Sequence, residues 1–162
     1  MNHLKIKKIV KNIFKNFKLK EAHAKISAEY LVKAELLGAP SHGLARLKMY
    51  CKRINKKIIN PNPRIKIKKI SQSISHIDAN NAIGFVGADL GIKTAIKNAK
   101  KTGIGLVAVK NSGHYGLSIF YAEQAVKKNL LVLCFTNAPP AIAPYGAKKS
   151  LFGTNPICFG TP

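Results

Sequence analysis

Apolar side chains recur at helical spacing through most of the first 55 residues. Over residues 3–18 they follow a period of 3.6 with lysines between them, which predicts an amphipathic helix with a lysine face. The stretch Glu21 to Leu37, rich in Ala and Leu, predicts a second helix. Pro40 interrupts this pattern, and Ser41 is placed to cap a third helix that runs to about Asn55.

Strand patterns begin after the turn signal at residues 60–63. Residues 64–68 alternate polar and apolar side chains, as a half-buried strand does, and residues 73–78 predict the next strand with a turn at 79–81. The later pattern predicts a helix over 84–101, a buried strand over 104–109, a helix over 117–128, a buried strand over 130–136 and a last strand over 157–160.

Three helices followed by alternating strands and helices predict an α/β (α+β) fold. We expect two parts, a helical segment over residues 1–60 and the beginning of a sheet-and-helix domain over 61–162. A chain of 162 residues can bury one domain's core. The last strand pattern starts just before Thr161 and Pro162. Because a compact domain rarely ends there, we expect a fragment.

Positive charge is the strongest bias in the composition. The formal net charge is +22, from 25 lysines but only 3 arginines, and 19 of these 28 basic residues precede Ile70. Proteins that read nucleic acid directly depend on arginine, whose planar fork matches phosphates and guanine edges. The lysines here follow solvent-facing positions. The composition therefore predicts no specific nucleic-acid partner, and leaves non-specific polyanion binding as a separate hypothesis.

Neither a membrane span nor a secretory signal is predicted. No apolar run reaches the roughly 18 residues that a bilayer requires, and the N-terminus alternates lysines with single apolar residues. The three scattered cysteines, Cys51, Cys134 and Cys158, lack metal-ligand spacing. We expect no metal site, a reduced cytoplasmic protein, and buried, inert thiols rather than catalytic ones.

Three polar side chains stand in one row of the predicted third helix. His42, Arg46 and Tyr50 are spaced at i, i+4 and i+8. Arginine binds a carboxylate through two hydrogen bonds and histidine offers a proton near neutral pH, so this row suits an anionic substrate. The alternative reading is purely structural: Ser41 caps the helix, His42 lies on the surface and Arg46 is a solvated charge.

A second candidate is His114, in the segment Lys110 to Gly116. This segment follows a predicted buried strand and precedes a predicted helix. Loops at strand ends present reactive groups on a rigid scaffold, and the flanking glycines allow a ligand to approach the backbone. Against this, a turn from strand to helix needs small polar residues for geometric reasons alone.

Two further segments follow or precede predicted strands. The first interpretation of each is a turn, and the second is a ligand-binding loop. They are Thr136 to Pro140 and Gly153 to Pro156. No Gly-x-Gly-x-x-Gly follows a strand, so the usual dinucleotide fingerprint is absent.

In combination these signals are specific, and their order and spacing resemble the malate/L-lactate dehydrogenase family that is distinct from the Rossmann-type lactate and malate dehydrogenases. That family also includes ureidoglycolate dehydrogenase, sulfolactate dehydrogenase and a cyclic-imine reductase. The resemblance covers essentially the whole chain. It rests on the N-terminal helices and on Ser41-His42-Gly43 with Arg46, residues 78–84, residues 111–116, Thr136-Asn137-Ala138, residues 143–146 and Gly153-Thr154-Asn155-Pro156.

The resemblance implies a role for each matching residue. His114 matches the general acid/base, Arg46 a residue that binds the substrate carboxylate, and Ser41 and His42 an active-site pair that orients substrate and proton. Tyr50 matches a position that lines the substrate pocket. The positions that match contacts to a nicotinamide cofactor, NAD or NADP, are Thr136, Asn137, Gly153, Thr154 and Asn155.

The resemblance also implies the fold and the assembly. The family has a largely antiparallel mixed sheet flanked by helices, not a Rossmann fold, and its members are usually dimers about twice as long as this chain. The expected function is hydride transfer between nicotinamide and C2 of a small 2-hydroxy or 2-oxo acid. The alternative is a truncated, inactive product that binds polyanions non-specifically.

Overall fold

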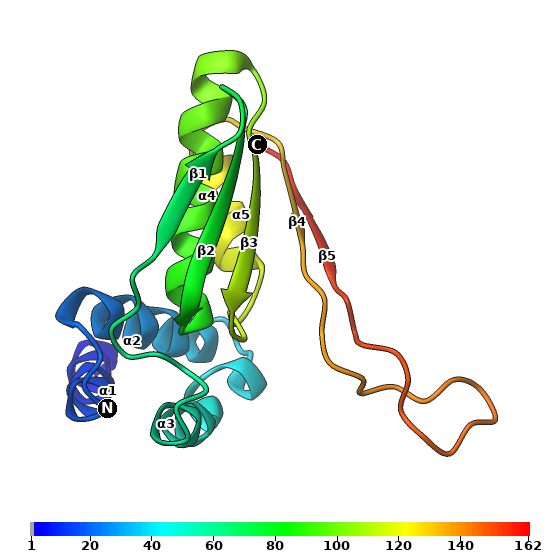
Figure 1. The fold of residues 1–162 in the computed structure, drawn as a ribbon. Helices are drawn as coiled ribbons and strands as arrows, with labels where there is room; N and C mark the ends of the chain where they lie inside the picture. The colour runs from blue at the N-terminus through cyan, green and yellow to red at the C-terminus, as the bar shows by residue number, and fades with distance from the viewer. Residues whose placement is uncertain (1) are drawn as a thin grey trace. The chain divides into compact units, whose positions relative to one another are not determined.

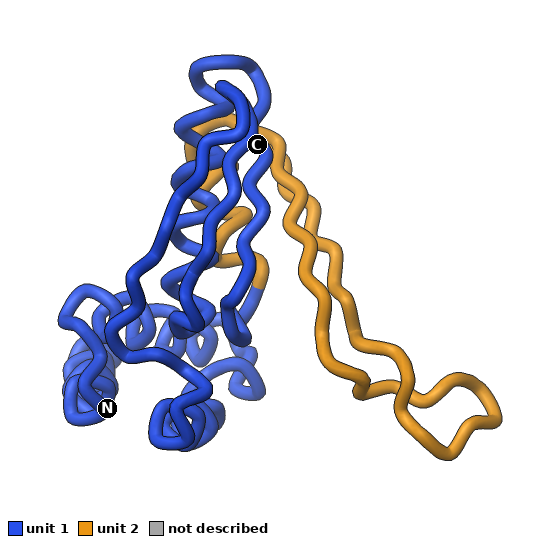
Figure 2. Tube along the Cα trace, viewed as in Figure 1, with its two compact units in different colours: residues 1–117 blue, residues 118–162 orange. Residues whose placement is uncertain are grey.

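The computed structural model describes residues 2–162, and its contacts divide the chain into two units, residues 1–117 and 118–162 (Figure 2). The first unit contains the elements α1 (His3–Asn16), α2 (Glu21–Leu36), η1 (Pro40–His42), η2 (Leu44–Arg46), α3 (Leu47–Asn55), β1 (Lys66–Lys69), β2 (Ile74–Ala82), α4 (Gly84–Thr102) and β3 (Leu106–Ser112). The second contains α5 (Ile119–Val126), β4 (Val132–Phe135) and β5 (Ile157–Gly160).

A mixed three-stranded sheet forms the centre of the first unit. Its order is β1-β2-β3, with β1 antiparallel to β2 and β2 parallel to β3. Helix α4 connects the two parallel strands and lies along the sheet, while α1, α2 and α3 gather at one end (Figure 1). The β2 side chains Ser75, Ile77 and Ala79 are buried. The expected α/β class with a mixed, mainly antiparallel strand pairing and no Rossmann sheet is confirmed.

Aromatic rings join the helices of the first unit. The ring centroid of Tyr50 on α3 lies 6.5 Å from that of Phe14 on α1 and 5.2 Å from that of Phe85 on α4. Tyr30 on α2 reaches Phe85 at 5.8 Å. The rings of Phe14, Tyr50 and Phe85 are fully buried. Aromatic side chains bury large areas, so this cluster fixes where α3 lies.

The second unit consists of one helix and one antiparallel hairpin. Strand β4 pairs with β5 so that Leu133 lies opposite Phe159 and Phe135 opposite Ile157. These four side chains are exposed. The other face of the hairpin packs within its own unit, since a side chain added at Gly160 would touch Val132 and two residues of α5, Ala122 and Val126.

The predicted third helix is wrong in its first part. Two short 3-10 turns occupy residues 40–46, and the α-helix begins only at Leu47. Between the turns Gly43 has φ −96° and ψ −137°, which is not a helical conformation. Ser41 therefore caps no α-helix, and its hydroxyl pairs instead with Nδ1 of His42 at 3.1 Å. His42, Arg46 and Tyr50 lie on three successive elements rather than in one helical row.

Several predicted strands are less buried than expected. All four residues of β1 are exposed, and β3 and β4 alternate between half-buried and exposed side chains instead of being buried throughout. For β3 the reason is visible: Val107 and Val109 face Gly91 of α4, while Leu106 on the opposite face is exposed. An apolar run shows that both faces are hydrophobic, but not that both are covered.

The predicted turn at 79–81 is also wrong, because the strand β2 continues to Ala82. Asn80 and Asn81 adopt positive φ values of 51° and 57° inside it, and the pairing with β3 shifts register between Asp78 and Ala82. Asparagine tolerates this left-handed conformation, so the turn signal marks an irregularity within a strand.

The three cysteines are free thiols and half-buried, not buried as expected. Burial nevertheless raises the pKa of the Cys134 thiol to about 11 and raises that of Cys51. Within residues 2–162 no helix is long and apolar enough to cross a membrane. The division into residues 1–60 and 61–162 stays a prediction.

Candidate active site

His114 lies in the segment that follows β3, and the backbone around it is tightly held. The amide of Gly113 donates to the carbonyl of Ala82 at 3.4 Å, where β2 ends. Gly84, the first residue of α4, faces the same segment, and a Cβ there would collide with the carbonyl groups of Gly113 and His114. A glycine at position 84 is therefore required for this close approach.

Tyr50 is the direct partner of the His114 side chain. Its hydroxyl oxygen lies 2.8 Å from Nδ1 of His114 and 3.4 Å from the His114 carbonyl oxygen. The amide of Gly116 donates to the same Nδ1 at 3.3 Å. Because Tyr50 belongs to the buried aromatic cluster, the imidazole is anchored to the core of its unit.

The 3-10 turns place the other candidates beside this imidazole. The ring of His42 stacks on that of His114, with centroids 5.7 Å apart and planes 27° from parallel. Nε of Arg46 donates to the carbonyl of Ser41 at 2.7 Å, which ties the second turn to the first. Ser41, His42, Arg46, Tyr50 and His114 thus all lie in the first unit, although Ser41, His42 and Arg46 lie on 3-10 turns instead of the expected α-helix.

The surroundings of His114 oppose a positive charge on its ring. Burial, followed by the charges of Arg46, His42 and Arg53, lowers its pKa from 6.5 to about 4. The pKa of His42 is lowered for the same reasons, burial first and then Arg46. Burial also raises the pKa of the Tyr50 hydroxyl, which stays protonated. An uncharged imidazole beside a guanidinium fits a site that receives an anion, because a bound carboxylate would offset the arginine charge.

Glu35 was not predicted from the sequence as a residue that holds the candidate site, and Gly116 was expected only as a glycine flanking His114. Glu35 on α2 accepts the amide of Leu44 at 2.6 Å, and a Cβ at Gly43 would collide with its side chain. Gly116, at φ 79°, directs its amide to the imidazole. The signal for Gly43 and Gly116 was their place next to the candidate histidines, whereas nothing local marks Glu35.

The candidate cofactor residues lie in two segments of the second unit, directly after β4 and before β5. The side chain of Asn155 accepts the amide of Ala138 at 2.8 Å, which joins the two segments. The Thr136 hydroxyl donates to the Asn137 carbonyl at 3.2 Å. A Cβ at Gly153 would collide with the carbonyl of Ala138. Exposed amide and hydroxyl groups at Asn137 and Thr154 suit a polar ligand such as a carboxamide.

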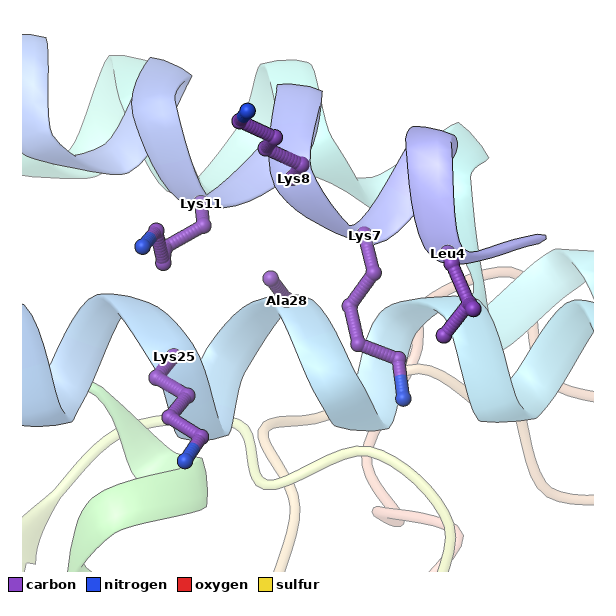
Figure 3. A pocket seen from close by; sticks show the side chains of 6 residues that line it. All are labelled: Leu4, Lys7, Lys8, Lys11, Lys25 and Ala28. Carbon is purple, nitrogen blue, oxygen red and sulfur yellow. The ribbon is translucent and has the colours of Figure 1, made fainter. Parts of the chain in front are cut away.

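A hollow between α1 and α2 has a different character (Figure 3). It is lined by Leu4, Lys7, Lys8, Lys11, Lys25 and Ala28. Lys11 is already paired with Glu21, at 2.8 Å between Nζ and Oε1. The hollow offers positive charge, and its lining contains no histidine, cysteine or carboxylate. Nowhere in residues 2–162 do three or more His, Cys, Asp or Glu side chains gather as a metal site would require.

Known proteins share much of this sequence. The sequence matches the malate/L-lactate dehydrogenase family over residues 1–162. It is 39% identical to L-sulfolactate dehydrogenase from Methanocaldococcus jannaschii, over 93% of this chain and 44% of that protein. It is 42% identical to malate dehydrogenase from Pyrococcus abyssi, over 88% of this chain and 39% of that protein.

Among solved structures, malate dehydrogenase from Pyrococcus horikoshii OT3 superposes with a TM-score of 0.95 at 35% identity, over 100% of this chain and 47% of that one. The chain thus spans less than half the length of these relatives. The match to the family extends over the whole chain, and the fold agrees. The chain therefore belongs to the malate/L-lactate dehydrogenase family.

Proposed function

We propose that this chain is the substrate-side part of an oxidoreductase that reversibly transfers a hydride between a nicotinamide cofactor and C2 of a small 2-hydroxy or 2-oxo acid. One observation carries the proposal: His114, held by Tyr50 at 2.8 Å, is stacked on His42 next to Arg46. When bound, the nicotinamide ring supplies or accepts the hydride. The residues of the chain bind the acid and move the proton.

Each side chain has a distinct task in this proposal. Arg46 binds the substrate carboxylate, because a guanidinium offers two parallel donors to it. His114 exchanges a proton with the substrate oxygen as a general acid/base. His42 and Ser41, linked at 3.1 Å, orient the substrate and share the polar environment of that oxygen.

The nicotinamide would contact residues of the second unit, namely Thr136, Asn137, Gly153, Thr154 and Asn155. The names of two relatives support a cofactor of this class. One is ureidoglycolate dehydrogenase (NAD(+)) from Escherichia coli O157:H7, 33% identical, and the other is (2R)-3-sulfolactate dehydrogenase (NADP(+)) from Chromohalobacter salexigens, 36% identical. We propose NAD or NADP, a homodimeric assembly and a place in the cytoplasm.

The decisive test is replacement of the proposed acid/base. His114→Ala is assayed against a panel of 2-oxo acids with NADH and NADPH, in the complete product of the reading frame that encodes these residues. We expect kcat to fall by roughly 100-fold or more, as removal of a general acid does. His76→Ala on β2, an exposed histidine, is the matched control. Turnover of every acid within threefold of wild type in the His114 variant would refute the assignment.

The same assay addresses the rival hypothesis of an inactive polyanion-binding product. That hypothesis predicts no turnover of any acid, together with nucleic-acid affinity that falls steeply with salt. Turnover of one or more 2-oxo acids excludes it. DNA sequencing downstream of Pro162 then shows whether the frame continues into a second half.

A further inference from the structure

The Tyr50 hydroxyl lies within hydrogen-bonding distance of two polar atoms of one residue. It is 2.8 Å from Nδ1 of His114 and 3.4 Å from the carbonyl oxygen of His114. A phenol has one hydrogen to donate and can also accept one. The hydroxyl can therefore bond Nδ1 in two ways, as a donor or as an acceptor.

The Gly116 amide decides which way holds in the uncharged imidazole. A backbone N–H can only donate, and it points at Nδ1 from 3.3 Å. Nδ1 consequently carries no hydrogen in the resting, neutral ring, and the Tyr50 hydroxyl donates to it as well. The single ring hydrogen then sits on Nε2.

A ring with its hydrogen on Nε2 can polarise a substrate carbonyl, but it must gain a second proton to act as an acid. That proton goes to Nδ1, which turns the nitrogen from acceptor into donor. Tyr50 can then accept from Nδ1–H, provided that its own hydrogen finds another acceptor. The carbonyl oxygen of His114 is that acceptor, and reaching it requires only rotation of the hydroxyl hydrogen.

We propose that Tyr50 is a positioning residue that keeps Nδ1 of His114 paired in both protonation states, so that Nε2 exchanges the proton with the substrate. The inference deepens the proposed function and rests on it. In the reductive direction the Nε2–H bond breaks as the O–H bond of the product alcohol forms, and the electron pair stays on Nε2. The ring is then neutral with its hydrogen on Nδ1, held by Tyr50. It returns to the resting Nε2–H form by proton exchange with water.

The charged neighbours make this pairing necessary. The groups that face the ring are His42 on the first 3-10 turn, Arg46 on the second, and Arg53 with Tyr50 on α3. None of them carries a negative charge. Among these groups Tyr50 alone can accept a hydrogen bond from Nδ1–H at the distance seen. Its removal should therefore make the protonated ring still less favoured than it is in the wild-type chain.

Tyr50→Phe tests the inference, with Tyr30→Phe as the matched control. Both hydroxyls are buried, both rings pack on Phe85, and the Tyr30 hydroxyl donates to Asp89 at 2.7 Å, away from His114. Side-chain ¹⁵N NMR of the chain first identifies the hydrogen-bearing nitrogen of His114 at neutral pH. We expect Nε2–H in wild type.

In Tyr50→Phe we expect the His114 titration midpoint to fall by roughly one pH unit, because a hydrogen bond to a charged group is about twice as strong as one to a neutral group. The bare Nδ1 signal should also shift downfield, since one of its donors is lost. Tyr30→Phe should change neither. A wild-type Nδ1–H tautomer, or an unchanged His114 spectrum in Tyr50→Phe, would overturn the inference.

Kinetics separate positioning from substrate binding. In the complete protein, Tyr50→Phe should lower kcat about tenfold or more and leave KM for the 2-oxo acid within twofold. A variant in which KM rises and kcat is unchanged would make Tyr50 a binding residue and contradict the inference. The NMR result is independent of activity, so it judges Tyr50 even if His114→Ala shows the proposed function to be wrong.

Discussion

The two units of this chain use their apolar residues differently. In residues 1–117 the large aromatic side chains Phe14, Tyr50 and Phe85 are fully buried. The candidate acid/base, His114, is hydrogen-bonded to Tyr50. In residues 118–162 the hairpin leaves Leu133, Phe135 and Phe159 exposed. The first unit thus supports its site with its own core, whereas the candidate cofactor residues extend from a hairpin with one uncovered apolar face.

The largest contrast is expected when one buried and one exposed aromatic ring are removed. Phe85→Ala should lower the free energy of unfolding of the first unit by about 3 to 5 kcal/mol, because it leaves a cavity beside Tyr50 and Tyr30. Phe159, 63% exposed, is the matched position in the second unit, and its replacement by Ala should cost less than about 1 kcal/mol. Urea unfolding with peptide-resolved hydrogen exchange measures both. Similar losses from the two variants would remove the contrast.

A smaller effect is expected from a methyl group at the junction that holds His114. In Gly84→Ala the new Cβ meets the carbonyl groups of Gly113 and His114, so the segment must shift, at a cost of about 2 to 3 kcal/mol. Gly113 is the matched control. Its added Cβ would lie 3.7 Å from the nearest atom, and its replacement by Ala should be tolerated.

The readout is thermal unfolding together with the NMR signal of His114. Gly84→Ala should shift that signal. If Gly113→Ala destabilised the chain as much as Gly84→Ala, the close approach at Gly84 would not explain the structure of this segment.

These elements also show how far sequence reasoning reaches. The amphipathic helix at the N-terminus, α2, α4 and the family motifs could be predicted, because helical periodicity and short motifs are local properties. The 3-10 turns could not, since the non-helical backbone at Gly43 lies against the side chain of Glu35, eight residues earlier in the chain. The hydrogen bond between Tyr50 and His114 could not be predicted either, because it joins residues 64 positions apart.

Burial was the least predictable property. The apolar runs that form β3 and β4 indicated buried strands, yet each strand has one exposed face. A run of apolar residues states which faces are hydrophobic and says nothing about what covers them. The same limit applies to the half-buried cysteines of the hairpin.

A fall in pH from about 6.5 to 4 should act on the first unit through its histidines. Three histidines have a lowered pKa, with His114 at about 4, and all the histidines of the chain lie in residues 1–117: His3, His23, His42, His76 and His114. In this window the unfolded state binds more protons than the folded state. The contribution of the histidines to the free energy of unfolding is therefore fully present above pH 6.5 and decreases as the pH falls towards 4.

At pH 5.5 His114 binds about 0.9 of a proton more in the unfolded state than in the folded state, given a pKa of about 6.5 in the unfolded state. His114→Gln should therefore flatten the dependence of the unfolding free energy on pH between 6.5 and 4. The loss linked to Glu21, whose pKa is lowered to about 2 by hydrogen bonds from Lys11 and Lys15, begins only below about pH 4.5 and should persist in the variant. An unchanged slope from pH 6.5 to 4 in His114→Gln would contradict the assigned environment of this ring.

The smallest effect concerns the two faces of the hairpin. Leu133→Thr lies on the exposed face and should change the stability of the second unit by less than about 0.5 kcal/mol, because little apolar surface is removed from contact. Val132→Thr, one residue earlier, lies on the face that packs against α5 and should cost about 1 kcal/mol, since it places a hydroxyl on the apolar face beside Gly160. Both substitutions keep a β-branched or strand-compatible side chain, so strand propensity does not explain the difference. Binding of a hydrophobic dye should fall with Leu133→Thr and not with Val132→Thr. The opposite order would mean that the face carrying Leu133 and Phe159 is the one packed in solution. The two units would then differ in which apolar face is covered, and not in how much apolar surface is covered.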